Sequence, residues 1–205
     1  AMIGNTPNAL IVNNSLPVNS AKELIEYLKK NPGRVSYGSA GQGSLTHLSG
    51  ELFKQSTETF MVHIPYRGIA PAITDLIGGQ TQVMFPGLAA AVPHIRGGKV
   101  KILAVTGKSR HPLFKDVPTL EEVGLKGFDA VQWYGIVGPA KMSTDIVAKL
   151  NESVAKVLTN PELQQKLSAE AVQTTPMTSA NFGKFIQEDI NRWTNLAKQR
   201  NIQLD

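Results

Sequence analysis

The sequence predicts an α/β protein in which helices cover a layered sheet. Short apolar runs typical of strands alternate with helical patterns up to Val105. A glycine-rich segment joins one of these strands directly to a helix, and beyond Gly127 the pattern changes to helices with little sheet. A chain of 205 residues, 41% hydrophobic and 18% charged, is long enough for one large or two small domains with a sizeable core.

Six short apolar runs are expected to be strands, because their residues follow the strand period or form continuous buried segments. These runs are Ala9 to Val12, Val35 to Tyr37, Phe60 to Ile64, Thr81 to Phe85, Lys101 to Val105 and Val131 to Val137.

Four helical patterns separate the first five runs. Ser20 is a plausible N-cap of the first helix, which Pro32-Gly33 would stop, and glycine pairs follow the third and fourth helices. The expected helices are Ser20 to Lys30, Ser44 to Ser56, Ala70 to Ile77 and Leu88 to Ile95.

The segment from Ser109 to Gly127 is rich in proline, glycine and charge, and is expected to be a connector with a short helix capped by Thr119. We therefore expect a domain boundary near Gly127, dividing the chain into residues 1–127 and 128–205. The second part has one confident strand and little sheet on which to pack its helices, so it looks incomplete. Its expected helices are Thr144 to Leu158, Pro161 to Leu167 and Ser179 to Asn201.

Charge and composition exclude several classes of protein. The net charge of +5 and the pI near 9.4 come from scattered lysines, without the basic block that tracks a nucleic-acid backbone. Zero cysteines exclude disulfides, thiolate metal sites and a cysteine nucleophile. No stretch approaches the roughly 18 apolar residues of a membrane span, and the first residues lack the pattern of a signal peptide.

The segment from Tyr37 to Ser44 predicts an anion site, because it is a glycine-rich turn that leads from a strand into a helix. N–H groups at a helix start lack intrahelical partners and carry partial positive charge. Neither a P-loop nor a G-x-G-x-x-G motif is present, and Ser39, Ser44 and His47 add neutral donors that suit a small carboxylate. A plain tight turn with Ser44 as N-cap is the alternative.

Ser44 and His47 lie three residues apart on one face of the expected helix. This spacing suggests a catalytic nucleophile and its base, with Asp75 as an imaginable third member of a triad. The serine is not in the G-x-S-x-G elbow of hydrolases, so a polar or structural role of His47 is favoured. The four histidines show no metal-ligand spacing, and no acidic cluster accompanies them; no metal site and no cofactor are expected.

Two further groups of residues are candidates for a ligand site. The loop from His63 to Gly68 ends a strand at the edge where ligands bind in open α/β sheets, so Tyr66 could offer its phenol or simply pack. Arg67 could clamp a carboxylate, although a solvated cation is favoured. Trp133 and Tyr134 could line a cleft or form a buried pair.

An ordered set of motifs resembles the Bug family, the periplasmic receptors of tripartite tricarboxylate transporters. The set covers essentially the whole chain, which makes it more specific than any single motif. It comprises Asn31-Pro32-Gly33, Tyr37 to Gly41, Gly43-Ser44, His47-Leu48, His63 to Gly68 (the family's V-P-Y-K-G), Leu76 to Gln80 (L-L-G-G-Q), Gly98 to Thr106, Asp116 to Gly124 (D-V-P-T-x-x-E-x-G), Trp133-Tyr134-Gly135 and Pro139.

The resemblance implies a fold like a type II periplasmic binding protein, with two α/β lobes around a carboxylate-binding cleft. Residues 1–127 would be the complete second lobe, and residues 128–205 the C-terminal return into the first lobe, whose N-terminal half is absent. It also implies a periplasmic location, with the signal peptide not present in this chain. The implied ligand-binding residues are Ser39, Ala40, Gly41, Gly43, Ser44, His47, Tyr66, Gly68, Trp133 and Tyr134.

Three departures from the family pattern concern the ligand. Arg67 stands where lysine is usual, Gln82 where aspartate is frequent, and the loop from Phe85 to Leu88 replaces a polar loop that lines the cleft.

The function expected from the resemblance is a non-catalytic receptor for a small organic acid, either a di- or tricarboxylate or an acidic amino acid. Closure of the lobes would bind the acid and present it to a membrane permease. One rival is a small α/β hydrolase that uses Ser44 and His47. Another is an orphan fragment with no binding activity, whose incomplete lobe would promote self-association.

Overall fold

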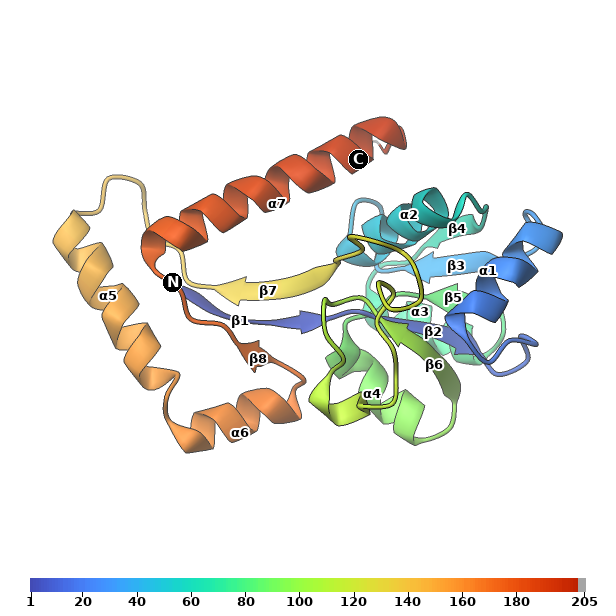
Figure 1. Cartoon of the computed structure of the whole chain (residues 1–205), viewed down its shortest axis with the longest axis horizontal. Helices are drawn as coiled ribbons and strands as arrows, with labels where there is room; N and C mark the ends of the chain where they lie inside the picture. Colours follow the sequence, from blue (N-terminus) through green and yellow to red (C-terminus); the bar gives the residue numbers. More distant parts are fainter. Residues whose placement is uncertain (203–205) are drawn as a thin grey trace. The chain divides into compact units, whose positions relative to one another are not determined.

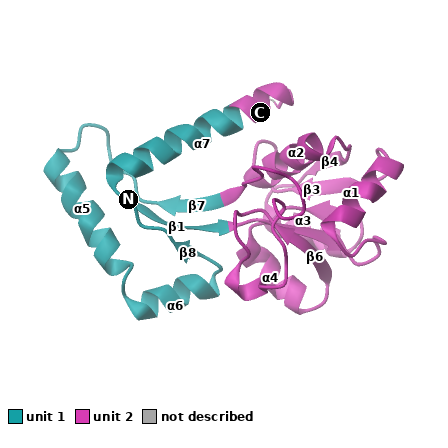
Figure 2. Cartoon of the chain, in the orientation of Figure 1, with its two compact units in different colours: residues 1–6, 132–194 teal, residues 7–131, 195–205 magenta. Residues whose placement is uncertain are grey.

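The computed structural model describes residues 1–202, which form two compact units (Figures 1 and 2). Unit 1 contains residues 1–6 and 132–194, and unit 2 contains residues 7–131 together with the described residues from Asn195 onwards. The boundary expected near Gly127 lies close to the change of unit between Val131 and Gln132. Unit 1 thus combines the first six residues with the later segment, and unit 2 takes in Asn195 onwards.

Unit 2 is built on a five-stranded sheet with the strand order β4-β3-β5-β2-β6. β3 runs parallel to β4 and β5, whereas β2 is antiparallel to β5 and β6. Every residue of β2 is buried, because β5 and β6 pair with its two edges and α3 and α4 pack on it. The strands are β2 (Ala9–Asn13), β3 (Ser36–Ser39), β4 (Val62–Pro65), β5 (Val83–Met84) and β6 (Val100–Val105), and the two helices just named are α3 (Ile69–Ile77) and α4 (Leu88–Arg96).

The helices of unit 2 confirm the predicted patterns to within one residue at each end. The other two are α1 (Ala21–Lys30) and α2 (Leu45–Thr57). α1 begins where the sequence predicts, since the hydroxyl of its N-cap Ser20 accepts the Glu23 N–H at 3.2 Å. α2 and α3 both pack on β3, so the strand that leads into the glycine-rich loop is held between helices and neighbouring strands.

Unit 1 contains a small sheet with the strand order β7-β1-β8. Its strands are β1 (Met2–Pro7), β7 (Val131–Gly135) and β8 (Gln173–Thr174), and its helices are α5 (Thr144–Val157), α6 (Pro161–Ala169) and α7 (Ser179–Gln199). The three expected helices are confirmed, and from Asn195 onwards α7 belongs to unit 2. Neither α5 nor α6 has a buried residue, so the apolar side chains of both helices are at least partly exposed to solvent.

The structure differs from the sequence-based expectations in two places. The strands β1 and β8 were not predicted; they form an antiparallel pair between segments about 170 residues apart, Gly4 opposite Thr174, and neither segment signals its partner. The short helix expected after Thr119 is wrong. Thr119 and Glu122 exchange the bonds of a capping box at 2.8 and 3.0 Å, but the chain continues as turns, and Gly124 adopts a φ of +110°.

Gly50 determines how closely α2 packs on β3. A Cβ atom at Gly50 would lie 2.3 Å from Cε2 of the Tyr37 ring, which is fully buried. Because Tyr37 is enclosed on all sides, the ring has no free space into which it could move. Glycine is therefore the residue that allows this helix to lie against this strand.

We expect Gly50→Ala to lower the free energy of unfolding by about 1–3 kcal/mol, because it overpacks the core against Tyr37. Gly183→Ala is the matched control. Gly183 is an exposed helical glycine of α7 where a Cβ atom would meet nothing within 4 Å, so alanine should stabilise the protein by about 0.5–1 kcal/mol. Denaturant unfolding measures both changes, and equal effects of the two substitutions would contradict this packing.

Candidate ligand-binding site

The glycine-rich loop lies at the edge of the sheet where the parallel strands β3, β4 and β5 end. It runs from Ser39, the last residue of β3, to Ser44, the N-cap of α2. Gly41 and Gly43 adopt φ values of +132° and +70°, which side chains disfavour. The sequence thus combines a strand end, a turn that requires glycine and a helix start in one short segment.

Several hydrogen-bond donors of the loop are already bonded to acceptors in the loop itself or in the first turn of α2. The Ala40 N–H donates to Oγ1 of Thr46 at 2.8 Å, the Gly43 N–H donates to Nδ1 of His47 at 3.1 Å, and the Ser44 hydroxyl donates to the Gly41 carbonyl at 2.6 Å. In the first turn of α2, the N–H groups of Leu45 and Thr46 have no carbonyl one turn earlier within the helix. Those two donors lie at the positive end of the helix dipole, where they could bind an anion.

A second loop lies beside the first. The Tyr66 N–H donates to the Ser39 carbonyl at 3.0 Å, and the Gly68 N–H donates to the Ala40 carbonyl at 3.1 Å. The structure therefore brings together the two loops that the sequence singled out. The Tyr66 hydroxyl donates to Asp75 at 2.8 Å, and partial burial, together with this carboxylate, raises the pKa of Tyr66 to about 12. Arg67 is exposed.

The polar contacts of Ser44, His47 and Asp75 do not form a catalytic triad. The Ser44 hydroxyl donates to the Gly41 carbonyl, the Nδ1 atom of His47 accepts the Gly43 N–H, and Asp75 accepts the Tyr66 hydroxyl. Each group of the imagined triad is thus bonded to a different partner. A nucleophile needs a base that accepts its proton, and here a backbone carbonyl accepts the proton of Ser44.

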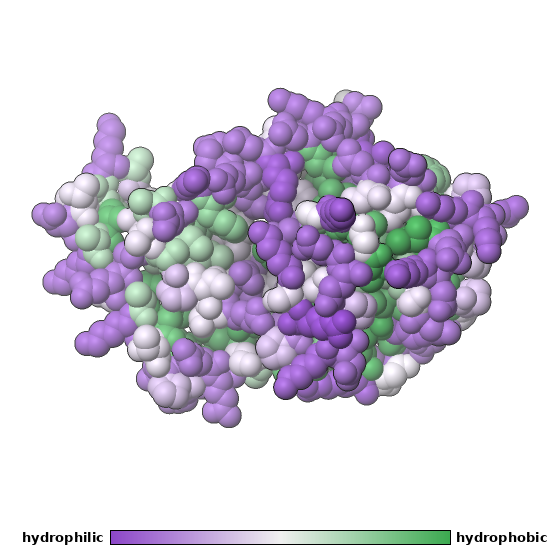
Figure 3. Space-filling view, viewed as in Figure 1, coloured by the Kyte–Doolittle hydropathy of each residue, from purple (hydrophilic) through white to green (hydrophobic). Residues whose placement is uncertain are grey.

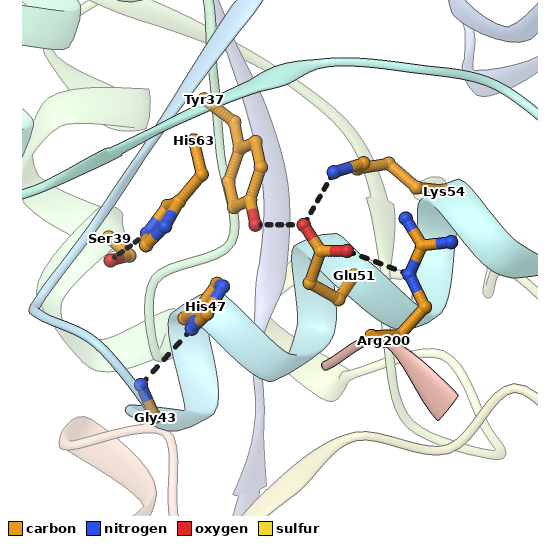
Figure 4. Close-up of polar contacts among 8 residues, drawn as sticks. All are labelled: Tyr37, Ser39, Gly43, His47, Glu51, Lys54, His63 and Arg200. Atoms are coloured by element: carbon orange, nitrogen blue, oxygen red, sulfur yellow. Dashed lines mark hydrogen bonds and ion pairs between the residues drawn. The ribbon is translucent and has the colours of Figure 1, made fainter. Parts of the chain in front are cut away.

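Three aromatic rings stack behind the loop (Figure 4). The rings of His47 and His63 are 3.8 Å apart between centroids and 4° from parallel, and Tyr37 lies 4.9 Å from His63. His63 also hydrogen-bonds through Nε2 to the Ser39 hydroxyl at 2.7 Å. The sequence did not single out His63 as a site residue. The available signal was its place at the end of a strand, but only the register of β3 and β4, which pairs Tyr37 with His63, places it here.

This cluster also contains a buried carboxylate on α2. Glu51 is 5% exposed and accepts the Tyr37 hydroxyl at 2.7 Å, Lys54 at 2.6 Å and Arg200 at 2.9 Å (Figure 4). Burial opposes ionisation of Glu51, but the hydrogen bonds from Lys54 and Tyr37 outweigh it and hold the pKa below its usual value. Burial, with the charge of Glu51, raises the pKa of Tyr37, so this phenol stays protonated and donates.

Among the residues predicted to bind ligand, Ser39 and His47 lie at the back of the loop. Ser39 is fully buried and His47 is 3% exposed. Ala40, Gly41, Gly43 and Ser44 are partly exposed at the front. The first two side chains therefore support the loop, and the others leave surface for a ligand.

Trp133 and Tyr134 lie on β7 of unit 1, whereas the two loops belong to unit 2. The Trp133 indole donates to Asp189 at 3.0 Å and packs edge-on against Phe182 and Phe185 of α7. Trp133 thus packs α7 against the small sheet of unit 1. Tyr134 is 36% exposed, and partial burial raises the pKa of its phenol.

The loop from Phe85 to Leu88, which departs from the family pattern, is packed into unit 2. The side chains of Phe85 and Leu88 are fully buried, and the Pro86 carbonyl accepts the Ala9 N–H at 2.8 Å. Apolar residues here therefore fill the core beside β2.

Two further features concern residues 1–202 as a whole. No helix in that range combines the length and the apolar character needed to cross a membrane. Within the same residues, histidine, aspartate and glutamate form no group of three or more able to hold a metal ion.

Solved structures of periplasmic binding proteins have the same fold. R. palustris Rpa4515 with adipate superposes with a TM-score of 0.87 at 33% identity, over 98% of this chain and 67% of that one. MatC (Rpa3494) from Rhodopseudomonas palustris with bound malate gives a TM-score of 0.79 at 28% identity, over 95% of this chain and 68% of that one. The periplasmic binding protein BugD superposes with a TM-score of 0.83 at 30% identity, over 98% of this chain and 68% of that one.

Sequence comparison gives the same relationship. Protein BugT of Bordetella pertussis is 30% identical over 204 residues, which is 100% of this chain and 63% of that protein. The chain thus spans about three fifths of the length of the curated relatives it matches. The family described as "Tripartite tricarboxylate transporter family receptor", whose members bind solutes and are not enzymes, matches residues 1–202. Because this match covers residues 1–202, the chain belongs to the tripartite tricarboxylate transporter receptor family.

Proposed function

We propose that the chain binds a small organic acid reversibly, as part of a receptor that delivers the acid to the permease of a tripartite tricarboxylate transporter. The acid would be a di- or tricarboxylate or an acidic amino acid. Family membership supports the receptor role, and two structural relatives, Rpa4515 with adipate and MatC with bound malate, hold dicarboxylates.

The observation that carries the proposal is the glycine-rich loop at the start of α2. It combines two first-turn N–H groups with the partial positive charge of a helix start, at the sheet edge where ligands bind in open α/β folds. Neutral donors of this kind hold a carboxylate without a buried cation, so the acid can leave again. The proposed ligand-binding residues of unit 2 are Ala40, Gly41, Gly43, Ser44, Tyr66 and Gly68, and the buried Ser39 and His47 would support the loop from behind.

Other parts of the expected mechanism stay predictions. They are the roles of Trp133 and Tyr134 at the ligand, residues 1–127 as a complete lobe with residues 128–205 as part of another, and lobe closure as the binding step. A periplasmic location is also proposed, in line with the structural relatives that are described as periplasmic.

We expect one class of di- or tricarboxylate to raise the melting temperature of this chain in a saturable manner. A ligand that binds only the folded state stabilises it by about 2.7 kcal/mol at a concentration of 100 times its Kd. A thermal-shift titration with mono-, di- and tricarboxylates measures the effect, and the matching diamides are the control because they keep the shape without the charge. Equal shifts with acids and amides, or no saturable shift with any acid, would contradict the proposal.

We expect Ser44→Ala to weaken binding of that acid without revealing any turnover. The change removes the N-cap of α2 and the bond to the Gly41 carbonyl, so it should cost about 1 kcal/mol of stability and about fivefold to tenfold in affinity. Ser143→Ala is the matched control, because Ser143 is the N-cap of α5 but makes no side-chain cap bond. Calorimetric titration measures the affinity. Ester hydrolysis by the wild type that Ser44→Ala abolishes would favour the hydrolase instead.

Unit 1 exposes several large apolar side chains on β7, on the residues after it and on α5. Ile136, Leu150 and Val157 line a groove of about 340 Å³ whose other lining residues are apolar except for Ser153, and Val137 lines an adjoining pocket with Ile136 and Leu150. Figure 3 shows hydrophobic residues at the surface of this part of the chain. The exposed residues are Tyr134, Ile136, Val137, Ile146, Leu150 and Val157. We propose that this face drives self-association, because a contiguous apolar surface in water favours burial against a partner.

We expect the chain to form dimers or larger species as its concentration rises, and Val137→Lys to shift the equilibrium toward monomer. Val137 is 73% exposed, so a lysine there is tolerated by the fold but opposes apolar contact. Val62→Lys is the control, because Val62 is an exposed valine on β4 of unit 2. Light scattering after size exclusion measures the mass. A monomer at every concentration, or an equal effect of both lysines, would contradict this role of the face.

A further inference from the structure

The two stacked histidines come from different elements and meet behind the ligand loop. His47 lies on α2 and His63 on β4, and their rings are nearly parallel at a centroid distance of 3.8 Å (Figure 4). Two imidazolium rings at this distance would repel each other. The geometry therefore disfavours a charge on both rings.

Each ring bonds to one end of the glycine-rich loop. Nε2 of His63 lies 2.7 Å from the Ser39 hydroxyl, where the loop begins. Nδ1 of His47 lies 3.1 Å from the Gly43 nitrogen, just before the loop ends at Ser44. The stack thus ties both ends of the loop to each other through two side chains.

These bonds determine where the protons lie. The Gly43 N–H can only donate, so Nδ1 of His47 carries no proton and the ring is the neutral Nε2–H tautomer. The Ser39 hydroxyl has one proton and lies 3.1 Å from the Gly41 carbonyl, which it can reach as a donor. If Nε2–H of His63 donates to Ser39, the serine keeps that bond and also accepts the Gly41 N–H at 3.2 Å.

We propose that His63, together with His47, positions the ligand loop as a pair of neutral rings. Protonation at acid pH takes the Nδ1 acceptor of His47 away from the Gly43 N–H and places positive charge on rings 3.8 Å apart, and this releases the loop and its ligand. The proposal rests on the proposed function for its ligand, and on the two bonds and the stack for its geometry. His63 acts through Ser39, and it is a positioning residue rather than a ligand contact.

The charges around the pair favour the neutral state at ordinary pH. Burial, then the neighbouring His47 and the Lys54 ammonium, lower the pKa of His63 from 6.5 to about 4, against the opposing charge of Glu51. Burial also lowers the pKa of His47, with Glu51 opposing and Lys54 assisting. Tyr37 on β3 stays neutral, and Arg200 pairs with Glu51.

The sign of the pH effect follows from these directions. An imidazole outside the stack takes up a proton near pH 6.5, whereas His63 in the stack does so near pH 4. The open loop therefore binds more protons than the closed loop between these values, and acid favours opening. Binding should be retained above about pH 6.5 and lost progressively as the pH falls toward 4.

Two variants of His63 separate the ring from its hydrogen bond. His63→Phe keeps an aromatic ring for the stack but loses the bond to Ser39, and His63→Gln keeps a donor near Nε2 but loses the stack and the titration. His94→Gln, on α4, is the matched control. Affinity for the acid that stabilises the wild type, measured by calorimetry at pH 7.5, 6.0 and 5.0, is the readout.

We expect His63→Phe to lose about fivefold to tenfold in affinity at pH 7.5, as for one lost hydrogen bond, and His63→Gln to recover part of that loss. Both should lose less affinity than the wild type between pH 7.5 and 5.0, because their side chains do not titrate. Comparing each variant with the wild type at the same pH cancels ionisation of the ligand. Affinities and pH profiles of both variants that match those of the wild type and His94→Gln would overturn the proposal.

A second readout needs no ligand and separates failure of this proposal from failure of the receptor role. Nitrogen-15 NMR of the wild type should show His47 as the Nε2–H tautomer, a neutral His63 ring at pH 6, and a slowly exchanging Gly43 amide that His63→Phe makes fast. A flat carboxylate titration with these signals intact would reject the receptor function and retain the paired rings. An Nδ1–H tautomer of His47, or a His63 that titrates near pH 6.5, would overturn the pair whatever the protein binds.

Discussion

A carboxylate buried in a helix must be paired, and the arrangement of unit 2 around the ligand loop depends on how Glu51 meets that requirement. Removing a charge from water costs several kcal/mol unless hydrogen bonds and opposite charges replace the lost hydration. Glu51 obtains these from Tyr37, Lys54 and Arg200. The Tyr37 hydroxyl is thereby held in one place, and the face of its ring becomes a flat support for His63. Gly50, one residue before Glu51, has no side chain, and a Cβ atom there would overlap the Tyr37 ring.

The same interactions hold the proposed ligand loop in one conformation. Its Ala40, Gly41 and Gly43 N–H groups already have partners within the protein, so the backbone is held before any ligand arrives. A preorganised site loses less conformational entropy on binding than a loop that must first become ordered. The donors that remain belong to a helix whose position is set by its packing on β3.

The features set by neighbouring residues were predicted well from the sequence. The features that depend on pairing between distant segments were not. The N-caps Ser20 and Ser44 and the ends of the four helices in unit 2 follow from neighbouring residues, and they agree with the structure. The strands β1 and β8 pair between opposite ends of the chain, so neither segment signals its partner. The two loops could be placed at one sheet edge because parallel strands end together. The stack of His63 required the register between β3 and β4, which periodicity does not contain. The residues after Thr119 carry a cap signal, but glycine ends the turn before a helix forms.

The uneven burial of the two units affects how the unfolding of this chain can be observed. Both tryptophans, Trp133 and Trp193, lie in unit 1, where α5 and α6 bury no residue. Unit 2 contains the fully buried β2 and the stack behind the loop, yet no tryptophan. Intrinsic tryptophan fluorescence therefore follows unit 1 alone, whereas far-ultraviolet circular dichroism follows both. Where the two optical probes give different midpoints, the chain does not unfold in one cooperative step, and each midpoint belongs to a different part of it.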